Sequence, residues 1–340
     1  MESKEINIIM LAMGEQFIKG YEKLNQRIKD NYKNVHLYRI GPMNYKEEID
    51  KLKHIKFDVL VSLPFFINVL TFILDTFPSI KWVHSLAAGI ENFFKIKKIY
   101  DDNIIFTNSR GAYSETLGEM GIVSMIYFSY NLNAYVESMQ NKKWEVHKNN
   151  TLYKKTLLII GYGNNGLCLA KRAKNGFNMK IIVVKKRLSE NYPGKEYVDE
   201  LYSLENLPDD AVNKADYIYA TLPETEETMN IFDINFFKKM NKNSVFINVG
   251  RGSAVVEDDI IYALENNIIR GALLDVTRVE PLNKDSKLYN ISPNKLLITN
   301  HSLCLNDGRI DDGFNFFYKD LEHYVKTGMP LTIVDKKSKY

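Results

Sequence analysis

A glycine-rich turn between an apolar run and a helix-like run constrains this sequence more than any other feature. The apolar residues 157–160 lead into Gly161-Tyr162-Gly163-Asn164-Asn165-Gly166, and the helix-like residues 167–174 follow. Three glycines alone are weak evidence, but a second apolar strand, residues 181–184, begins about twenty residues further on. This strand–turn–helix–strand context predicts a dinucleotide-binding unit.

Each glycine of this turn has its own physical task. Because glycine has no Cβ, Gly161 can make the sharp turn and Gly163 can let a pyrophosphate approach the backbone, while Gly166 lets helix and strand pack closely. The free N–H groups of the first helical turn, at Asn164 and Asn165, can face the phosphates. These five residues are the candidates for binding the pyrophosphate of a cofactor.

The end of the second strand reads Lys185-Lys186-Arg187. Units that bind NAD carry an Asp or Glu here, which accepts hydrogen bonds from the adenosine ribose. A carboxylate would repel a 2′-phosphate, whereas three cations attract one, and Arg can hold it with two hydrogen bonds. We therefore predict NADP(H) as the preferred coenzyme and NAD(H) as a second one. The alternative is a solvated basic turn in a lysine-rich chain.

The composition is that of a globular protein of two domains. The chain has 340 residues, of which 45% are hydrophobic and 26% charged, and a net charge of +3 that does not suggest a nucleic-acid binder. Two cysteines, Cys168 and Cys304, cannot build a disulfide framework and show no metal-ligand spacing, so no metal site is predicted. With neither a signal-peptide pattern nor an apolar run of the ~20 residues that span a membrane, a cytoplasmic protein is expected.

Alternating strands and helices predict α/β architecture throughout. The first third offers strands at 6–10, 35–38, 59–62, 82–85 and 104–107, and the second series offers strands at 157–160, 181–184, 217–221, 245–249, 271–275 and 296–299. This rhythm predicts parallel sheets covered by helices on both faces. Between the two series, residues 113–140 form a long apolar helical stretch that is expected to pack between domains or against a partner subunit.

Four polar residues of the second series stand at or after predicted strand ends: Asp275 ends a strand, and Arg251, Glu280 and His301 follow one. A guanidinium can contact the carboxylate and the carbonyl of a 2-oxo acid together, and a histidine with a pKa of ~6.5 can supply the proton that a reduced carbonyl oxygen needs. A carboxylate within ~4–6 Å would keep the imidazole charged, and Glu280 is our candidate.

Each of these residues also has an ordinary structural explanation. Arg251 beside two glycines can neutralise the end of an element, and Asp275 can be a turn residue. An isolated histidine is more often a packed or surface residue, which is how we interpret His36, His54, His84, His147 and His323. The four candidates together, each at or after a predicted strand end, favour the functional interpretation.

From Trp82 to His301 the chain resembles the D-isomer-specific 2-hydroxyacid dehydrogenases, and looks closest to their glyoxylate/hydroxypyruvate reductases. Besides the glycine turn, the matching stretches are Ser85-Leu86-Ala87-Ala88-Gly89-Ile90, Thr107-Asn108-Ser109-Arg110-Gly111, Leu222-Pro223-Glu224-Thr225-Glu226-Glu227-Thr228, Asn248-Val249-Gly250-Arg251-Gly252, Leu274-Asp275-Val276 and Glu280-Pro281.

The resemblance implies a fold and an oligomer. The fold is two doubly wound parallel-sheet domains with a cleft between them. A flavodoxin-like substrate domain would comprise residues 1–110 and 301–340, and a Rossmann dinucleotide-binding domain residues 111–300. It also implies a homodimer joined through the nucleotide domain and residues 113–140.

The resemblance further implies residue roles. Arg251 would bind substrate, Glu280 would orient His301, and His301 would be the general acid/base. The backbone at Ala87, Ala88 and Gly89 would hold the substrate carboxylate. The implied cofactor-binding residues beyond the glycine turn and the basic run are Leu222, Pro223, Thr228, Val249, Gly250 and Asp275.

Two departures from the family pattern stand out. Asn300 occupies the place before the catalytic histidine where the family usually has Pro, and Pro would fix φ and remove a donor. Glu91 replaces a common Asp after the carboxylate loop. The sequence thus predicts an NADPH-preferring reductase of small 2-oxo acids. The alternative is a dinucleotide-sensing, corepressor-like binding protein with weak or no catalysis, which Asn300 keeps open.

Overall fold

The computed structural model describes residues 4–101, 103–305 and 308–337, and the chain divides into two compact units. The first unit comprises Met1–Tyr113 and Asp307–Tyr340, and the second comprises Ser114–Asn306. The sequence predicts these divisions after residues 110 and 300, which would put His301 in the first unit. In the structure His301 lies in the second unit. Its segment stays there because Leu303 is buried in that unit's core.

The first unit contains a parallel sheet of five strands in the order β2-β1-β3-β4-β5. The strands are β1 (Ile6–Leu11), β2 (Val35–Ile40), β3 (Val59–Ser62), β4 (Trp82–Ser85) and β5 (Ile105–Asn108). Because helices cover both faces, the inner strand β3 is buried throughout, whereas the edge strand β2 alternates between buried and exposed residues. One face packs against α1 (Glu15–Asn31) and α10 (Arg309–Thr327), and the other against α2 (Tyr45–Leu52) and α3 (Ile67–Thr76).

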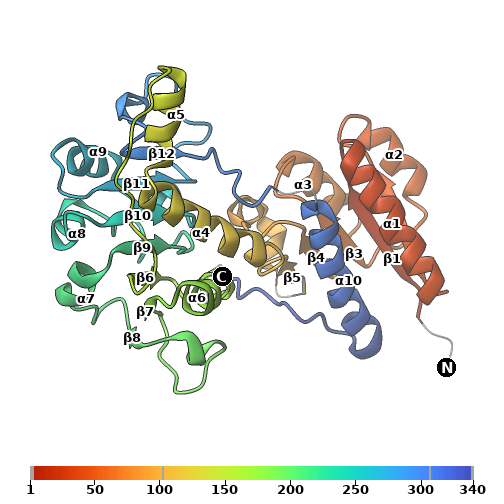
Figure 1. The fold of residues 1–340 in the computed structure, drawn as a ribbon. Helices are drawn as coiled ribbons and strands as arrows, with labels where there is room; N and C mark the ends of the chain where they lie inside the picture. Colours follow the sequence, from red (N-terminus) through yellow and green to blue (C-terminus); the bar gives the residue numbers. More distant parts are fainter. Residues whose placement is uncertain (1–3, 102, 306–307, 338–340) are drawn as a thin grey trace. The chain divides into compact units, whose positions relative to one another are not determined.

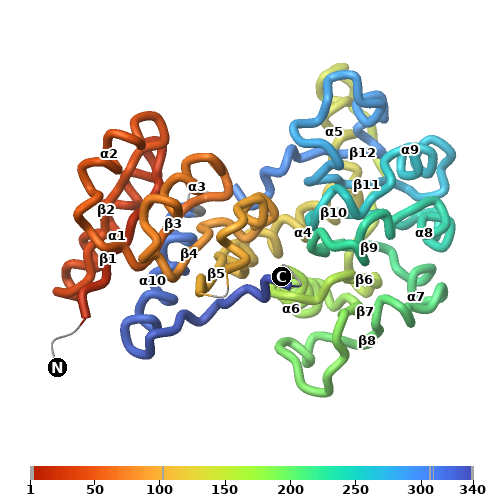
Figure 2. Tube along the Cα trace, turned by 180° about the vertical axis from the view of Figure 1, so that it is seen from behind, coloured from red at the N-terminus to blue at the C-terminus, as the bar shows by residue number. Residues whose placement is uncertain are grey.

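Helices from the N-terminal and C-terminal parts of the sequence pack together in this unit. Helix α10 lies beside α1 although nearly the whole sequence separates them (Figures 1 and 2). Lys23 of α1 pairs with Asp311 of α10 at 2.7 Å. A unit built from both chain ends allows the second unit to be an insertion.

The second unit contains a parallel sheet of seven strands in the order β12-β11-β10-β9-β6-β7-β8. The strands are β6 (Thr156–Ile160), β7 (Lys180–Val184), β8 (Glu200–Tyr202), β9 (Tyr217–Ala220), β10 (Val245–Asn248), β11 (Gly271–Leu274) and β12 (Leu296–Ile298). Two buried apolar clusters, one on each face, hold the helices to this sheet. The helices are α4 (Ser114–Ser129), α5 (Leu132–Gln140), α6 (Asn164–Phe177), α7 (Asp209–Lys214), α8 (Ile234–Lys239) and α9 (Glu257–Glu265).

The prediction of two doubly wound parallel sheets is confirmed. Two local expectations were wrong. The sequence did not indicate β8, because this three-residue edge strand is only half-buried and has no apolar run. The expected helical stretch at 113–140 breaks between α4 and α5, where Asn131 adopts a left-handed φ of 48°.

The strand order reverses beside β6, between β7 and β9. In open α/β sheets, ligands bind beyond the carboxyl ends of the strands at such a point. Within the described residues, no helix combines the length and apolar character that crossing a bilayer requires. Neither Cys168 nor Cys304 forms a disulfide in the part of the chain that the structure describes.

Candidate active site

The glycine turn lies at this reversal point, between β6 and α6. Gly161 has a φ of +100°, and a Cβ there would lie 2.8 Å from the carbonyl oxygen of Thr221. A Cβ on Gly166 would lie 2.9 Å from both the Gly161 oxygen and Ile159 Cγ2. Helix α6 begins at Asn164 directly after Gly163, so its first N–H groups stand at the turn. Close packing therefore requires glycine at 161 and 166, and the N–H groups that begin α6 stand at this turn, which fits a bound pyrophosphate.

Asn165 has a structural task besides its place in the turn. Its side-chain oxygen accepts a hydrogen bond from Ser114 Oγ at 2.6 Å, and its Nδ2 donates to Thr221 Oγ1 at 3.3 Å. These bonds tie the start of α6 to α4 and to the end of β9. The side chain is thus used within the protein, which leaves the backbone of Asn165 for the ligand.

The three cations of the basic run have different surroundings. Lys185 Nζ lies 4.5 Å from the ring centroid of Tyr192 and 5.6 Å from that of Tyr162, and burial there lowers the pKa of its ammonium group. Lys186 Nζ pairs with Glu227 at 2.6 Å. Arg187 is exposed and has no ion pair or hydrogen bond within the described residues.

A second loop of the cofactor edge follows β9. The hydroxyl of Thr228 donates to the Pro223 carbonyl at 2.7 Å and accepts from the Thr225 N–H at 2.9 Å, so it fixes the loop. A Cβ on Gly250 would lie 2.5 Å from the Leu222 oxygen. Val249 donates its N–H to Ala220 at 3.0 Å. The backbones of the loops after β9 and β10 therefore contact each other, and glycine at position 250 makes this contact possible.

Glu280 and His301 form a hydrogen-bonded pair. Glu280 Oε2 lies 2.7 Å from His301 Nδ1, and the other carboxylate oxygen accepts the Thr277 N–H at 3.0 Å. The side chains are 36% and 46% exposed, so both groups are open to a ligand. Within the described residues His301 Nε2 has no hydrogen-bond partner.

The pair shifts the pKa of both members. The hydrogen bond from Glu280 raises the pKa of His301 above 6.5, against opposing contributions from burial and from the charge of Arg251. Burial raises the pKa of Glu280, but the hydrogen bonds from His301 and Thr277 and the charge of Arg251 outweigh it and leave that pKa below 4.5. Each shift therefore favours the charged form of its group.

Arg251 completes the cluster. Its charge acts on both Glu280 and His301, so the three groups expected at one edge are brought together in the second unit. The Arg251 guanidinium donates to the Gly250 carbonyl at 2.8 Å. The backbone carbonyl of Arg251 accepts the Asn248 side-chain N–H at 3.0 Å. These bonds fix the loop after β10 that carries Arg251.

Asp275 has a structural role, as the turn-residue alternative allowed, but the sequence did not indicate its partners. Its side chain is 3% exposed. Its Oδ1 accepts hydrogen bonds from Thr299 Oγ1 at 2.8 Å, from Ser302 N at 3.0 Å and from Leu303 N at 3.3 Å. Its backbone carbonyl accepts the His301 N–H at 2.6 Å. Asp275 therefore anchors the turn that presents His301.

The departure at Asn300 has a conformational explanation. Asn300 and His301 both have a φ of 53°, in the left-handed region. Proline is locked near −65° and could not adopt this conformation, whereas Asn and His are among the residues that do so most readily. In this chain, the turn before the histidine requires a residue other than proline.

The loop at Ala87, Ala88 and Gly89 belongs to the first unit. It follows β4, and Asn108 Nδ2 donates to the Ala88 carbonyl at 2.8 Å. The backbone N–H groups of Ala88 and Gly89 donate to no acceptor within the described residues. They are thus available to an anionic ligand.

The doubly wound sheet and its glycine turn place the protein in the class of dinucleotide-binding α/β proteins. The profile of the family described as "D-isomer specific 2-hydroxyacid dehydrogenase, NAD binding domain" matches residues 122–302, more than half of the sequence. The chain therefore belongs to this dehydrogenase family, and the resemblance noted from its motifs is confirmed.

Curated relatives extend this similarity. The chain is 30% identical over 225 residues to a probable 2-ketogluconate reductase of Dictyostelium discoideum, covering 64% of this chain and 65% of the relative, slightly less than two thirds. It is 28% identical over 283 residues to a glyoxylate/hydroxypyruvate reductase B of Enterobacter sp. (strain 638), covering 80% of this chain and 82% of that relative.

Solved structures share the fold over nearly the whole length. A D-isomer specific 2-hydroxyacid dehydrogenase family protein from Aeromonas salmonicida subsp. salmonicida A449 is 26% identical, with a TM-score of 0.81 and coverage of 98% of this chain and 99% of the other. An NADPH-dependent glyoxylate/hydroxypyruvate reductase from Sinorhizobium meliloti, crystallised with NADP and sulfate, has a TM-score of 0.77 at 22% identity, covering 99% and 100%. The latter likeness concerns the fold alone.

Proposed function

We propose that this protein is an NADPH-preferring reductase of small 2-oxo acids of the glyoxylate/hydroxypyruvate type, and that it forms D-2-hydroxy acids. The observation that carries the proposal is the Glu280–His301 pair at 2.7 Å beside the charge of Arg251. Relatives named as glyoxylate/hydroxypyruvate reductases support the substrate class.

Under this proposal the reduced nicotinamide, when bound, supplies a hydride to the carbonyl carbon of the substrate. The carbonyl oxygen must then receive a proton. His301 Nδ1 is engaged by Glu280, so Nε2 is the nitrogen that gives the proton to the oxygen. Arg251 orients the carboxylate and the carbonyl of the substrate and stabilises the developing negative charge.

The first unit would act as the substrate domain. Its free N–H groups at Ala88 and Gly89 suit a carboxylate, because backbone donors aimed at an anion need no side chain. The second unit would hold the coenzyme at the glycine turn. Residues Leu222, Pro223, Thr228, Val249, Gly250 and Asp275 would line the adjoining edge.

The preference for NADPH rests on the basic run. Lys185 lies over two tyrosine rings and Lys186 is paired with Glu227, so Arg187 is the cation of this run best placed to bind a 2′-phosphate. A guanidinium can hold a phosphate by two charge-assisted hydrogen bonds. A structural neighbour crystallised with NADP supports this choice, and one crystallised with NAD is consistent with a second coenzyme.

We also propose a homodimer joined through the second unit and residues 113–140. Apolar side chains on and just after α5 are unusually exposed: Met139 at 72%, Trp144 at 100% and Val146 at 91%. Such residues in sequence proximity are typical of an interface. Light scattering after size exclusion should give twice the chain mass, and Trp144→Ser should shift the population toward monomer.

The activity is tested by mixing the purified protein with NADPH and a panel of 2-oxo acids, and following the absorbance of the reduced coenzyme. We expect the fastest oxidation with glyoxylate or hydroxypyruvate. A flat trace across the panel, together with measurable NADPH binding, would contradict the reductase and favour the dinucleotide-sensing alternative.

A further inference from the structure

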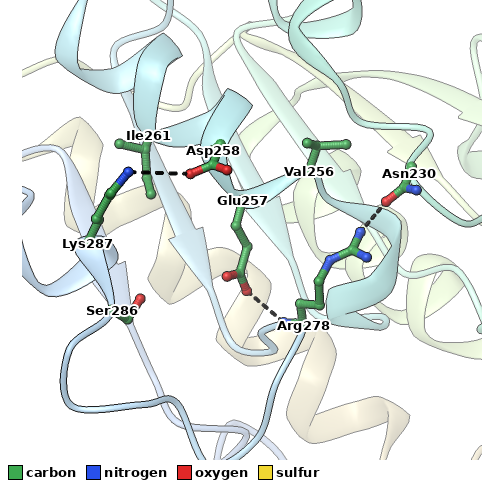
Figure 3. A pocket seen from close by; sticks show the side chains of 8 residues that line it. All are labelled: Asn230, Val256, Glu257, Asp258, Ile261, Arg278, Ser286 and Lys287. Atoms are coloured by element: carbon green, nitrogen blue, oxygen red, sulfur yellow. Dashed lines mark hydrogen bonds and ion pairs between the residues drawn. The ribbon is translucent and has the colours of Figure 1, made fainter.

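The turn that carries Glu280 is held from its outer side by a second carboxylate, Glu257. Glu257 Oε1 accepts the backbone N–H of Arg278 at 2.7 Å. Glu257 stands in the first turn of α9, and the two groups line a surface pocket of about 520 Å³ (Figure 3). The contact joins α9 to a loop that begins 20 residues further along the chain, at Thr277, and has no helix or strand of its own.

The side chain of Arg278 adds a second attachment on the same side. Its guanidinium donates to the side-chain oxygen of Asn230 (Figure 3). It also donates to the carbonyl of Val255 at 3.3 Å. Arg278 therefore holds the turn by its side chain, whereas Glu257 holds it by the backbone. The backbone bond is the more direct constraint, because it fixes the peptide between Thr277 and Arg278.

The inner side of this peptide is also closed. A Cβ on Gly252 would lie 2.0 Å from the carbonyl group of Thr277 and 2.6 Å from the Arg278 nitrogen. The peptide is thus enclosed between Gly252 and Glu257. Its neighbouring N–H, that of Thr277, donates to Glu280 Oε1 at 3.0 Å, and Glu280 Oε2 contacts His301.

We propose that Glu257 is a positioning residue for the Glu280–His301 pair: by holding the Arg278 N–H, it fixes the turn that presents the Glu280 carboxylate to the imidazole. The proposal rests on the proposed function only in that the pair serves proton transfer. Glu257 itself touches neither member of the pair. It acts through the chain Glu257, Arg278 N–H, Thr277 N–H and Glu280.

A general stabilising role of Glu257 can be separated from positioning. An acidic residue in the first turn of a helix interacts favourably with the helix dipole, and Asp258 stands in the same turn of α9. Asp258 also lines the same pocket, but it faces Lys287, at 3.9 Å, rather than the turn. Asp258→Ala is therefore a matched control that loses the dipole contribution and keeps the bond to Arg278.

The experiment compares the wild type with Glu257→Ala, Glu257→Gln and Asp258→Ala. The first readout is the pKa of His301 in the coenzyme-free protein, from an NMR titration of imidazole Cε1–H resonances, assigned by the signal that His301→Gln removes. The groups whose charges reach His301 are Glu280, Asp275 and Arg251, and none of the variants alters them. The second readout is kcat and KM for the reaction.

We expect Glu257→Ala to move the pKa of His301 down toward 6.5 and to lower kcat by about tenfold to a hundredfold, the size of effect that a small misplacement of a reacting group produces. Glu257→Gln keeps an acceptor oxygen and should lie between wild type and Glu257→Ala in both readouts. Asp258→Ala should behave as wild type, and KM for the coenzyme should stay unchanged in all variants.

The proposal is overturned if Glu257→Ala leaves the titration of His301 at its wild-type position, or if Asp258→Ala shifts it equally. Should Glu257→Ala fail to fold, amide exchange decides: rapid exchange of the Arg278 N–H in the wild type, or protection unchanged in Glu257→Gln, would contradict the proposal, and strong wild-type protection that is reduced in Glu257→Gln would support it. If no 2-oxo acid is reduced, the proposed function fails, while the titration still tests the positioning.

Discussion

Glu280 and His301, 21 residues apart in the sequence, share a hydrogen bond of 2.7 Å at the carboxyl edge of the second sheet. Glu280 stands in the loop after β11 and His301 in the turn after β12, and these strands are neighbours. The pairing therefore follows from the topology, since adjacent parallel strands end side by side. The predictions below test what this arrangement does.

Replacing Glu280 should change the pH dependence of reduction. Glu280 raises the pKa of His301 above 6.5, so the imidazolium that donates the proton persists to higher pH and activity falls as pH rises through that pKa. In Glu280→Gln the pKa returns toward 6.5, and the alkaline limb of the kcat profile should move to lower pH. An unchanged profile would show that Glu280 does not set this titration.

The same pair should contribute to stability in a defined pH window. Because the pKa of His301 is raised in the folded state, its contribution to stability is fully present below pH 6.5. The contribution is lost as the pH rises through the pKa that His301 has in the folded state. A lowered pKa on Glu280 stabilises above 4.5, and that contribution is lost as pH falls through the folded pKa. Urea unfolding should therefore show the largest destabilisation by Glu280→Gln between these values.

Asn300→Pro tests the conformation of the turn before His301. Proline cannot reach the φ of 53° that Asn300 adopts, so the variant should misplace His301 and lose most of its turnover. Asn300→Gly is the matched control, because glycine reaches positive φ without strain and should keep activity near wild type. Full activity in Asn300→Pro would show that another conformation supports the reaction.

Arg187→Ala tests the coenzyme assignment. Losing a charge-assisted contact to the 2′-phosphate should raise KM for NADPH by about tenfold or more and leave KM for NADH unchanged. Lys171→Ala removes another exposed cation, on α6, and should change neither value. Equal effects of Arg187→Ala on both coenzymes would indicate a general role of charge.

Glu227→Gln should improve NADPH binding several-fold, because it releases Lys186.

His84 should make the first unit sensitive to acid. It is fully buried, with Nδ1 2.7 Å from Thr107 Oγ1, and burial lowers the pKa of its imidazole to about 3. Below pH 6.5 the unfolded state therefore binds a proton that the folded state does not bind. This lowers the free energy of unfolding by about 2 kcal/mol at pH 5 relative to pH 7.5. Oδ2 of the buried Asp320 lies 3.6 Å from His84 Nδ1, and burial raises the pKa of this carboxyl. Asp320 therefore binds a proton more readily in the folded state and opposes part of this loss of stability.

Denaturant unfolding of wild type and His84→Gln at the two pH values measures the effect. Gln does not titrate, so its stability should fall less on acidification than that of the wild type. Parallel losses in both proteins would assign the acid sensitivity to other groups.

Much of the fold could be predicted because buried parallel strands read as apolar runs. The strands at β6, β7, β9, β10 and β11 stand within a residue or two of their predicted positions. Strand β8 could not be predicted, since its side chains are only half-buried. The break at Asn131 also left no clear signal, because an asparagine in a left-handed conformation does not differ in sequence from one inside a helix.

The residues of the candidate site were predictable as a set, but their supports were not. Arg251, Glu280 and His301 each follow a strand, and strand ends converge in a parallel sheet. The bond from the Arg278 N–H to Glu257, and the bonds from the Ser302 and Leu303 N–H groups to Asp275, have backbone donors. Which N–H a carboxylate accepts depends on the path of a loop, which no residue pattern states.

The most direct test of the account is His301→Ala, with turnover of NADPH and glyoxylate measured beside NADPH binding. Loss of the general acid should lower kcat by about 10²–10⁴-fold, while the dissociation constant for NADPH stays at its wild-type value. Wild-type turnover in His301→Ala would contradict the assignment of proton transfer to the Glu280–His301 pair.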